Sequence, residues 1–156
     1  MAEDSTNLII VESPSKARTL KRFLGDKYQI EASVGHIRDL PKNDLGVDVE
    51  NGFKPTYVAS EDKSKVISQL KSLTKKAGIL YLATDPDREG EAIAWHLVEL
   101  LKPTIPVKRL AFHEITKSAI QESFDHTRNI DESLVSAQET RRILDRLWGY
   151  KVSEKL

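Results

Sequence analysis

Four carboxylates stand where two apolar runs of the sequence end. Glu12 follows the first run directly, and the second run is followed by Asp85, Asp87 and Glu89. Ligands of open parallel sheets bind outside the carboxyl ends of the strands, so the four side chains converge if the two runs are neighbouring strands. Two unit charges about 4 Å apart repel by roughly 4 kcal/mol at an effective dielectric of about 20, so such a cluster needs shared protons or a cation. Oxygen ligands without Cys or His favour Mg²⁺ over zinc.

Helix capping is the alternative explanation for the Asp-x-Asp-x-Glu segment. Acids in the first turn of a helix are favoured by the helix dipole. Asp85 as N-cap, Pro86 as the first helical residue and Asp87 as the second would satisfy that role alone. Capping does not explain why Glu12 ends another buried strand, or why Gly90 follows the acids so closely. We therefore favour a metal site, and capping stays open for the segment taken by itself.

Lys16 is the candidate phosphate-binding residue beside these acids. It lies one helical turn beyond Glu12, near the expected start of a helix. A helix N-terminus and an ammonium group together form an anion site. An ordinary solvated lysine is the alternative, and the short distance along the helix to Glu12 favours the anion site.

Charge is unevenly distributed along a chain whose formal net charge is zero. Residues 16–27 carry +4 and residues 141–156 carry +3, whereas the acids concentrate at residues 85–91. In the second basic segment Arg142 and Arg146 are four residues apart and share a helix face, and we expect an ion pair between Arg141 and Asp145 beside them. Guanidinium groups suit phosphate recognition. A solvated, salt-bridged helix face is the alternative.

An alternation of strands and helices is predicted to position these side chains. The runs at residues 8–11 and 79–83 lack polar alternation, as strands buried on both faces do. Ser13 as N-cap, the proline after it and Gly25 as the stop predict a helix over residues 13–24. Further strands are expected at residues 28–34, 56–59 and 107–112. Further helices are expected from Ser60 or Asp62 to Gly78, from the acids to residue 101, at residues 117–126 and from Asp131 onward. Residues 35–53 are expected to be rich in loops. This order predicts an α/β fold with a mainly parallel sheet and helices on both faces.

Length and composition fit one domain with the start of a second. The chain has 156 residues, of which 39% are hydrophobic and 31% charged. We expect residues 1–128 to form the α/β domain and residues 129–156 to begin a separate helical domain. Apolar runs of strand length predict no membrane span, and the polar start predicts no secretory signal. The absence of Cys fits a reducing cytoplasm.

Five segments, in order, carry the motifs of a known family. They are Val11-Glu12-Ser13-Pro14-Ser15-Lys16-Ala17, Gly35-His36-Ile37-Arg38-Asp39-Leu40-Pro41, Ala83-Thr84-Asp85-Pro86-Asp87-Arg88-Glu89-Gly90-Glu91-Ala92-Ile93-Ala94-Trp95-His96, Phe112-His113-Glu114-Ile115-Thr116 and Arg141-Arg142-Ile143-Leu144-Asp145-Arg146-Leu147-Trp148-Gly149-Tyr150-Lys151-Val152-Ser153. Together they resemble the N-terminal part of bacterial type IA DNA topoisomerases, with a Rossmann-like TOPRIM domain at residues 1–128 and the start of the helical DNA-binding domain at residues 129–156. The Val-Glu-Ser-Pro opening favours the topoisomerase I branch over the topoisomerase III branch.

The resemblance implies an ATP-independent isomerase in the cytoplasm, associated with the nucleoid. Such an enzyme relaxes negatively supercoiled DNA by transient single-strand cleavage, a 5′-phosphotyrosine link and strand passage. Glu12 would be general acid/base and metal ligand, and Lys16 would stabilise phosphate charge. Mg²⁺ would be held by Asp85, Asp87 and Glu89 together with Glu12. The residues expected to contact single-stranded DNA are His36, Arg141, Arg142, Ile143, Asp145, Arg146 and Lys151.

The resemblance also implies that the nucleophilic tyrosine lies outside this chain. The tyrosines present are Tyr28, Tyr57, Tyr81 and Tyr150, and none stands in a matching context. We therefore expect a fragment that does not cleave DNA by itself. Its partners would be the single-stranded region of negatively supercoiled DNA and the remaining domains of the enzyme, including the one that carries the tyrosine.

Three other functions stay open. TOPRIM-type primases and nucleases share the acids but lack the His-Ile-Arg-Asp-Leu-Pro and Arg-Arg-Ile-Leu-Asp-Arg segments. Phosphatases of the haloacid dehalogenase type place their Asp-x-Asp pair after the first strand, where this chain has Glu12. A non-catalytic DNA-binding module is the third alternative.

Overall fold

The centre of the structure is a four-stranded parallel sheet. The computed structural model describes residues 6–34, 37–41, 45–50 and 52–155, and the side chains of residues 6, 61 and 150–155 are not described. The strands lie in the order β2-β1-β7-β8, and all three pairings are parallel. Their bounds are Tyr28–Ala32 for β2, Thr6–Val11 for β1, Ala77–Leu82 for β7 and Val107–Arg109 for β8. The two uninterrupted apolar runs therefore form the two central strands, as expected for strands buried on both faces.

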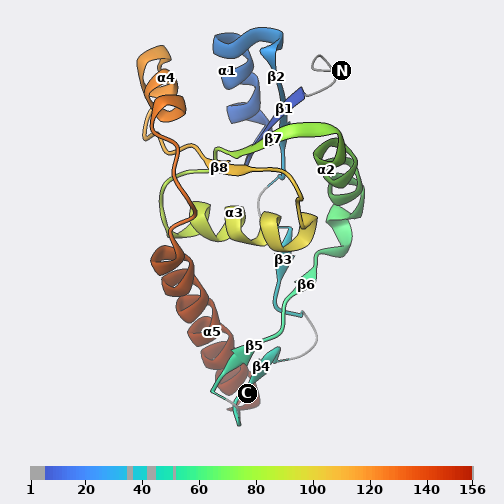
Figure 1. The fold of residues 1–156 in the computed structure, drawn as a ribbon. Helices are drawn as coiled ribbons and strands as arrows, with labels where there is room; N and C mark the ends of the chain where they lie inside the picture. Colours follow the sequence, from blue (N-terminus) through green and yellow to red (C-terminus); the bar gives the residue numbers. More distant parts are fainter. Residues whose placement is uncertain (1–5, 35–36, 42–44, 51, 156) are drawn as a thin grey trace.

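Helices cover both faces of this sheet, which confirms the predicted fold class (Figure 1). On one face lie α1 (Pro14–Leu24) and α4 (Lys117–Asp125), which contribute Leu20 and Ile120 to a core that includes Ile9 and Tyr81. On the other face lie α2 (Ser64–Lys76) and α3 (Arg88–Leu101). Alternate residues of each central strand thus point into different cores.

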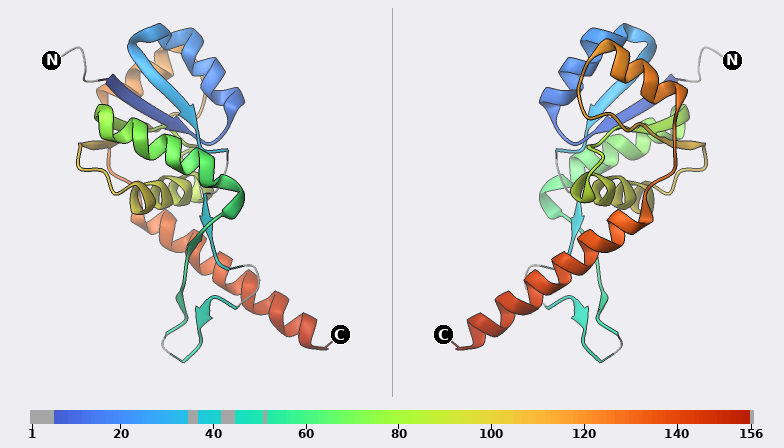
Figure 2. Two further views of the ribbon diagram at one scale, coloured as in Figure 1. Left: turned by 90° about the vertical axis from the view of Figure 1, so that its right-hand side faces the viewer. Right: turned by 90° about the vertical axis from the view of Figure 1, so that its left-hand side faces the viewer.

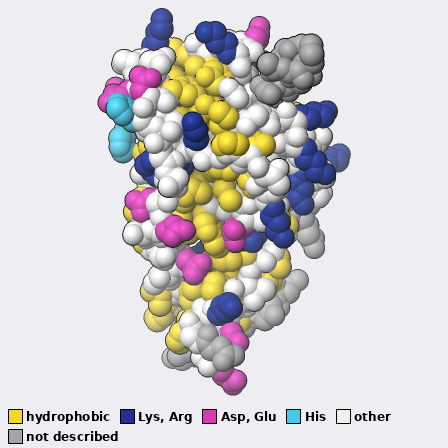
Figure 3. Space-filling model, in the orientation of Figure 1, with side chains coloured by type: hydrophobic (Ala, Val, Ile, Leu, Met, Phe, Trp, Pro, Cys, Tyr) yellow, Lys and Arg dark blue, Asp and Glu magenta, His cyan; other side chains and the backbone are white. Residues whose placement is uncertain are grey.

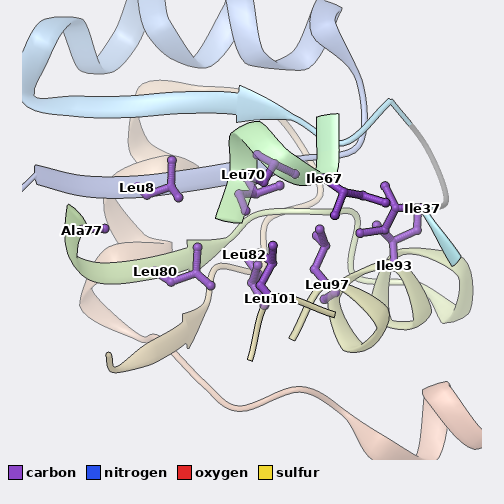
Figure 4. Close-up of a cluster of buried hydrophobic side chains, with 12 residues drawn as sticks. Leu8, Ile37, Ile67, Leu70, Ala77, Leu80, Leu82, Ile93, Leu97 and Leu101 are labelled. Carbon is purple, nitrogen blue, oxygen red and sulfur yellow. The ribbon is translucent and has the colours of Figure 1, made fainter. Parts of the chain in front are cut away.

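The second core is the larger of the two and is drawn in Figure 4. Leu8 and Ile10 of β1 and Leu80 and Leu82 of β7 point toward α2 and α3, and none of the four is more than 1% exposed. Each fully buried side chain of this size contributes about 1.5–3 kcal/mol relative to an exposed one. The helix residues that complete the core are Ile67, Leu70, Ile93, Ala94, Leu97 and Leu101.

Side-chain caps determine where helices α1 and α4 begin. Ser13 accepts a hydrogen bond from the Lys16 amide at 3.2 Å and is the N-cap of α1, with proline at the next position and Gly25 at the C-cap. Thr116 caps α4 through the Ala119 amide. These signals are local, which is why the sequence predicted both helices to within one residue.

Helix α5 (Glu132–Lys155) begins beside α3 and extends away from the sheet (Figures 1 and 2). Its first turn is capped by Asp131, whose carboxylate accepts from the amides of Ser133 and Leu134. Two short antiparallel pairs accompany it: β3 (Arg38–Asp39) with β6 (Val58–Ala59), and β4 (Val47–Asp48) with β5 (Lys54–Pro55). Within the described residues, no helix has the length and apolar character that a membrane span requires.

Several predicted boundaries were wrong, and each error has a local cause. The loop-rich segment contains β3 and β4, and the expected strand at residues 56–59 shrinks to β6, because two-residue strands leave no periodic pattern. Helix α2 begins at Ser64 after a 3₁₀ turn (Glu61–Lys63), without the predicted cap at Ser60 or Asp62. Gly78 does not end that helix but lies inside β7.

The strands β2 and β8 are shorter than predicted, ending at Ala32 and Arg109 instead of at residues 34 and 112. Both flank the central pair, so fewer backbone bonds hold their ends. Arg109, the last residue of β8, exchanges two backbone hydrogen bonds with Arg128, so this end of the outer strand has a partner on its other side.

Gly90, in the first turn of α3, generates a test of this packing. A β-carbon added there would lie 1.8 Å from the Asp85 carbonyl oxygen, whereas one added at Gly149 of α5 would meet nothing within 4 Å. We expect Gly90→Ala to lower the free energy of unfolding by about 2–3 kcal/mol through overpacking against the loop. The matched control Gly149→Ala should raise it by about 0.5–1 kcal/mol, since Ala is the better helix former.

Urea unfolding of both variants measures the two changes. A Gly90→Ala chain as stable as the wild type would show that the loop after β7 does not pack against α3 as described.

Candidate active site

Glu12 and Asp85 meet at the carboxyl edge of the sheet, joined by the ammonium group of Lys16. The Asp85 backbone amide donates to Glu12 Oε2 at 2.7 Å. Lys16 Nζ lies 3.1 Å from Glu12 Oε1 and 3.0 Å from Asp85 Oδ1, so it pairs with both carboxylates and offsets part of their negative charge. Residues 73 positions apart in sequence thus form one site, as the neighbouring strands predicted.

Local structure explains how the three side chains come together. Glu12 follows β1, and Asp85 follows β7, its direct neighbour in the sheet. The ladder continues one bond beyond β7, where the Ala83 amide donates to the Ile10 carbonyl at 2.9 Å. Lys16 is four residues beyond Glu12 on α1, and its side chain is only 9% exposed. Its ammonium group also lies 5.1 Å from the ring centre of Phe112.

The two carboxylate oxygens of Glu12 have different surroundings. Its Oε2 accepts the Asp85 amide, while its Oε1 is buried and makes no hydrogen bond within the described part of the chain, although Lys16 Nζ is near enough for an ion pair. A buried carboxylate oxygen without a hydrogen bond is costly. A cation that binds this oxygen would therefore break no hydrogen bond, but it would compete with Lys16.

Asp87 and Glu89 do not join this cluster directly. Asp87 is the N-cap of α3, and its Oδ1 accepts from the Gly90 amide at 2.7 Å. Glu89 lies exposed in the first turn of α3. The capping alternative was thus right about the role and wrong about the residue, because the helix begins at Arg88, beyond both Asp85 and Pro86. Across the residues that the structure describes, no three His, Asp or Glu side chains converge as a complete ligand set.

The donor chemistry of the site nevertheless fits Mg²⁺. Glu12 and Asp85 offer carboxylate oxygens of the kind that Mg²⁺ prefers, and Mg²⁺ is commonly held by one or two protein carboxylates with waters. Glu12 Oε1 supplies an oxygen with no hydrogen bond. The ammonium group of Lys16 occupies the position between the carboxylates, where a cation is needed to balance their charge.

Two of the three predicted DNA-contacting arginines, Arg142 and Arg146, lie on one face of α5, and both have partners within the chain. Arg142 forms a bidentate ion pair with Asp39, in which Nε donates to Oδ1 at 2.9 Å and Nη2 donates to Oδ2 at 3.0 Å. The hydrogen bonds to Asp39 raise the pKa of Arg142. Arg146 donates to the carbonyls of Pro41 and Leu45 at 2.6 and 3.2 Å. Arg142 therefore ties α5 to β3, and Arg146 ties it to the segment that follows β3.

The other predicted DNA-contacting residues are placed less closely. The side chains of Arg141 and Asp145 are exposed, and the predicted ion pair between them is not formed among the described residues. Exposed ion pairs are worth little, so solvation competes with them. Ile143 is half-buried beside Phe53 and Leu144 in a groove under the β4–β5 hairpin. His36 and the side chain of Lys151 lie outside the described residues.

Arg38 forms an aromatic cluster next to these arginines that the sequence did not predict. Its Nε donates to His96 Nδ1 at 3.0 Å, and its guanidinium group lies 5.0 and 5.2 Å from the ring centres of Tyr57 and Trp95. Contacts of this kind contribute about 0.5–2 kcal/mol. They hold β3 against α3.

Comparison with known proteins assigns these features to a family. The family model described as the Toprim domain matches residues 7–115. The chain belongs to the Toprim domain family.

Curated relatives extend the similarity over nearly the whole chain. This Toprim domain chain is 55% identical over 99% of its length to DNA topoisomerase 1 of Streptomyces coelicolor and 52% identical over 96% to DNA topoisomerase 1 of Synechococcus elongatus. It spans 18% of the length of each of these relatives. The structure of full-length topoisomerase I from Thermotoga maritima matches with a TM-score of 0.87 and 48% identity, over 94% of this chain and 25% of that one. The resemblance to bacterial topoisomerase I is confirmed.

The sequence did not predict the buried ion network behind the acids of this Toprim domain. Glu91 is completely buried, and its carboxylate accepts from Arg109 at 2.6 and 3.0 Å, from Arg128 at 2.8 and 3.2 Å, and from the Asp131 amide at 2.9 Å. The sequence did contain one indication that Glu91 is buried. Its spacing from Ala94 and Leu101 places it on the buried face of α3. Breaking such a buried pair costs about 3–5 kcal/mol, because the remaining charge has no partner.

The pKa of Glu91 makes this network testable by pH. Burial alone raises that pKa, but the hydrogen bonds from Arg128, Arg109 and the Asp131 amide outweigh it, so the net pKa lies below the ordinary value of 4.5. A carboxylate with a lowered folded pKa contributes stability that is fully present above the unfolded pKa and is lost as pH falls through the folded value. Glu91→Gln should therefore be less stable than the wild type by about 3–5 kcal/mol at pH 7.

Thermal unfolding of both proteins between pH 7 and pH 3 measures the difference. The gap should be constant down to about pH 4.5 and should narrow below it, because only the wild type loses the Glu91 charge. The exposed control Glu132→Gln should show no comparable gap, and a gap that widens in acid would contradict the lowered pKa.

Proposed function

We propose that this chain is the Mg²⁺-binding and DNA-binding part of a type IA DNA topoisomerase. Such an enzyme relaxes negatively supercoiled DNA without ATP, by transient cleavage of one strand through a 5′-phosphotyrosine link and passage of the other strand. The observation that carries the proposal is the contact between Glu12 and Asp85 across the two central strands, with Lys16 bridging both. The relatives named DNA topoisomerase 1 support the same conclusion.

Glu12 is proposed as the general acid/base at the departing 3′ oxygen of DNA. The Asp85 amide fixes Oε2, so Oε1, which is ion-paired with Lys16 and has no hydrogen bond, is the oxygen proposed to hold the proton that is transferred. A positioned proton carrier of this kind contributes typically 10²–10⁴-fold to the rate.

Lys16 is proposed to offset the charge of the phosphoryl oxygens in the transition state. Its ammonium group is held in place by two carboxylates and by its helix, so it needs little reorganisation. Bound Mg²⁺ would add positive charge beside the scissile phosphate, held by Glu12 and Asp85, with Asp87 and Glu89 contributing after they turn from their present positions.

Single-stranded DNA is the proposed partner of α5 and of the segment around His36. Positive charge supports this proposal: Arg141 is exposed, Arg142 is partly exposed, and Arg146 reaches the segment after β3. Phosphate binding by Arg142 would compete with Asp39, which already orients its planar group in the geometry that suits a phosphate. Residues 129–156 are proposed to begin the helical DNA-binding domain, and the cytoplasmic nucleoid is the proposed location.

Mg²⁺ should stabilise the fold through the carboxylates of the site. An ion that binds only the native state adds about 2.7 kcal/mol at a hundredfold excess over its Kd, so the melting midpoint should rise as Mg²⁺ is added. Asp85→Asn combined with Asp87→Asn should abolish the rise. Asn also caps helices well, so the second substitution removes charge from Asp87 but keeps its cap.

The matched control is Asp26→Asn combined with Asp125→Asn, two exposed acids elsewhere on the surface. It should keep the full Mg²⁺ response. An equal rise in all three proteins would indicate a general salt effect and no specific site.

The chain alone should form no covalent link to DNA. Tyr28 and Tyr81 pack against Phe124, and burial together with the Glu139 carboxylate raises the pKa of Tyr57, which opposes its use as a nucleophile. Incubation with negatively supercoiled plasmid or single-stranded oligonucleotide, followed by denaturation, should give neither relaxation nor an adduct. An adduct would show that a tyrosine of this chain is the nucleophile.

In a topoisomerase of the relatives' full length that contains this segment, Glu12→Gln should lower cleavage by about 10²–10⁴-fold and leave oligonucleotide binding largely intact. Loss of binding with unchanged cleavage per bound complex would instead make Glu12 a positioning residue.

A further inference from the structure

The backbone of the loop that carries Asp85 is held from behind by a single buried side chain. Arg109, the last residue of β8, is 1% exposed. Its Nη1 donates to the carbonyls of Leu82 and Thr84 at 2.9 and 2.6 Å, and also to the Leu110 carbonyl at 3.0 Å. Its Nη2 donates to the Asp85 carbonyl at 2.7 Å. One guanidinium group therefore binds three carbonyls at the end of β7 and in the loop after it.

The two sides of Asp85 are thus held by different parts of the fold. Its carbonyl faces Arg109, and its amide faces Glu12. With both neighbouring peptide groups fixed, the Cα–Cβ bond of Asp85 has one direction, from which its carboxylate reaches Lys16. Gly90 adds a steric limit, because a β-carbon at that position would lie 1.8 Å from the same Asp85 carbonyl oxygen.

Arg109 is itself fixed by Glu91. The carboxylate accepts from Nε at 3.0 Å and from Nη2 at 2.6 Å, so the plane of the guanidinium group cannot turn without losing an ion pair. Arg128, whose own side chain is partly exposed, binds the same carboxylate but makes no described contact with the loop carbonyls. The network therefore contains one arginine that contacts the loop and one that does not.

We propose that Arg109, anchored by Glu91, is a positioning residue that holds Asp85 in the orientation needed for cation binding beside Glu12. The inference rests on the proposed function only in identifying the ion as Mg²⁺. A lysine cannot replace Arg109, because one ammonium group cannot reach the loop carbonyls and Glu91 together in the planar geometry of a guanidinium group.

The test compares the wild-type chain with Arg109→Lys and Arg128→Gln by NMR. Without metal, hydrogen exchange of the Asp85 amide should be faster by about tenfold or more in Arg109→Lys, because local opening of the loop becomes easier. With Mg²⁺, half-saturation followed on the Asp85 and Glu12 amides should shift to a concentration about 10–100-fold higher, as when a residue that orients a metal ligand is lost. Arg128→Gln should change both quantities by less than about twofold.

Three outcomes would overturn the inference. They are an Asp85 amide equally protected in Arg109→Lys, an unchanged Mg²⁺ half-saturation in that variant, and an equal effect of Arg128→Gln, which would show general loss of the network. Glu91→Gln, which keeps the size of the side chain and releases Arg109, serves if Arg109→Lys does not fold, and it should shift both quantities in the same direction. A wild-type chain that shows no saturable Mg²⁺ shift would refute the proposed metal site, while the exchange measurement would still decide the role of Arg109.

Discussion

The parallel pairing of β1 with β7 is the constraint on which the rest of the structure depends. It places the ends of both apolar runs at one edge of the sheet, so Glu12 and Asp85 leave the sheet as neighbours. It also brings the first turns of α1 and α3 to that edge, and these supply Lys16 and the Asp87 cap. A shift of one residue between the strands would exchange the side chains pointing into the two cores, so the pattern of buried residues holds the register.

The features that the sequence predicted were those with local signals. Ser13 and Gly25 bound α1, the run at residues 8–11 is a central strand, and the alternation of elements gives helices on both faces. The meeting of Glu12 with Asp85 also follows from such signals, because neighbouring parallel strands align their carboxyl ends. Short strands such as β3 and β4 escaped because two residues show no period.

The contacts that the sequence did not predict depend on partners far apart in the chain. Asp39 and Arg142 are 103 positions apart, and no local pattern joins them. Buried charges are equally hard to predict. Arg109 lies in a segment whose pattern predicts a strand, and a charged residue there would be expected at the surface, because its partner Glu91 is not near it in the sequence.

The surface charge is also unevenly distributed in space. Figure 3 shows Lys and Arg side chains gathered at the edge where α2 lies, and α2 exposes Lys65, Lys71, Lys75 and Lys76. Positive charge is therefore concentrated in particular segments of the sequence and also on a particular side of the folded chain.

Two positively charged side chains explain how the loop after β7 keeps its conformation although the carboxylates of Glu12 and Asp85 lie close together. Lys16 lies between Glu12 and Asp85 on the outer side, and Arg109 binds the loop carbonyls on the inner side. Their roles differ because their surroundings differ. Arg109 is enclosed, has a partner in Glu91 and contacts only backbone in the loop, so it can fix the loop without neutralising the acids. Lys16 offsets part of the charge of the acids, and the side chain of Asp85 is 59% exposed to solvent. An entering cation would therefore compete with Lys16 for the carboxylates but would leave the contacts of Arg109 in place, and the loop could exchange one positive partner for another without refolding.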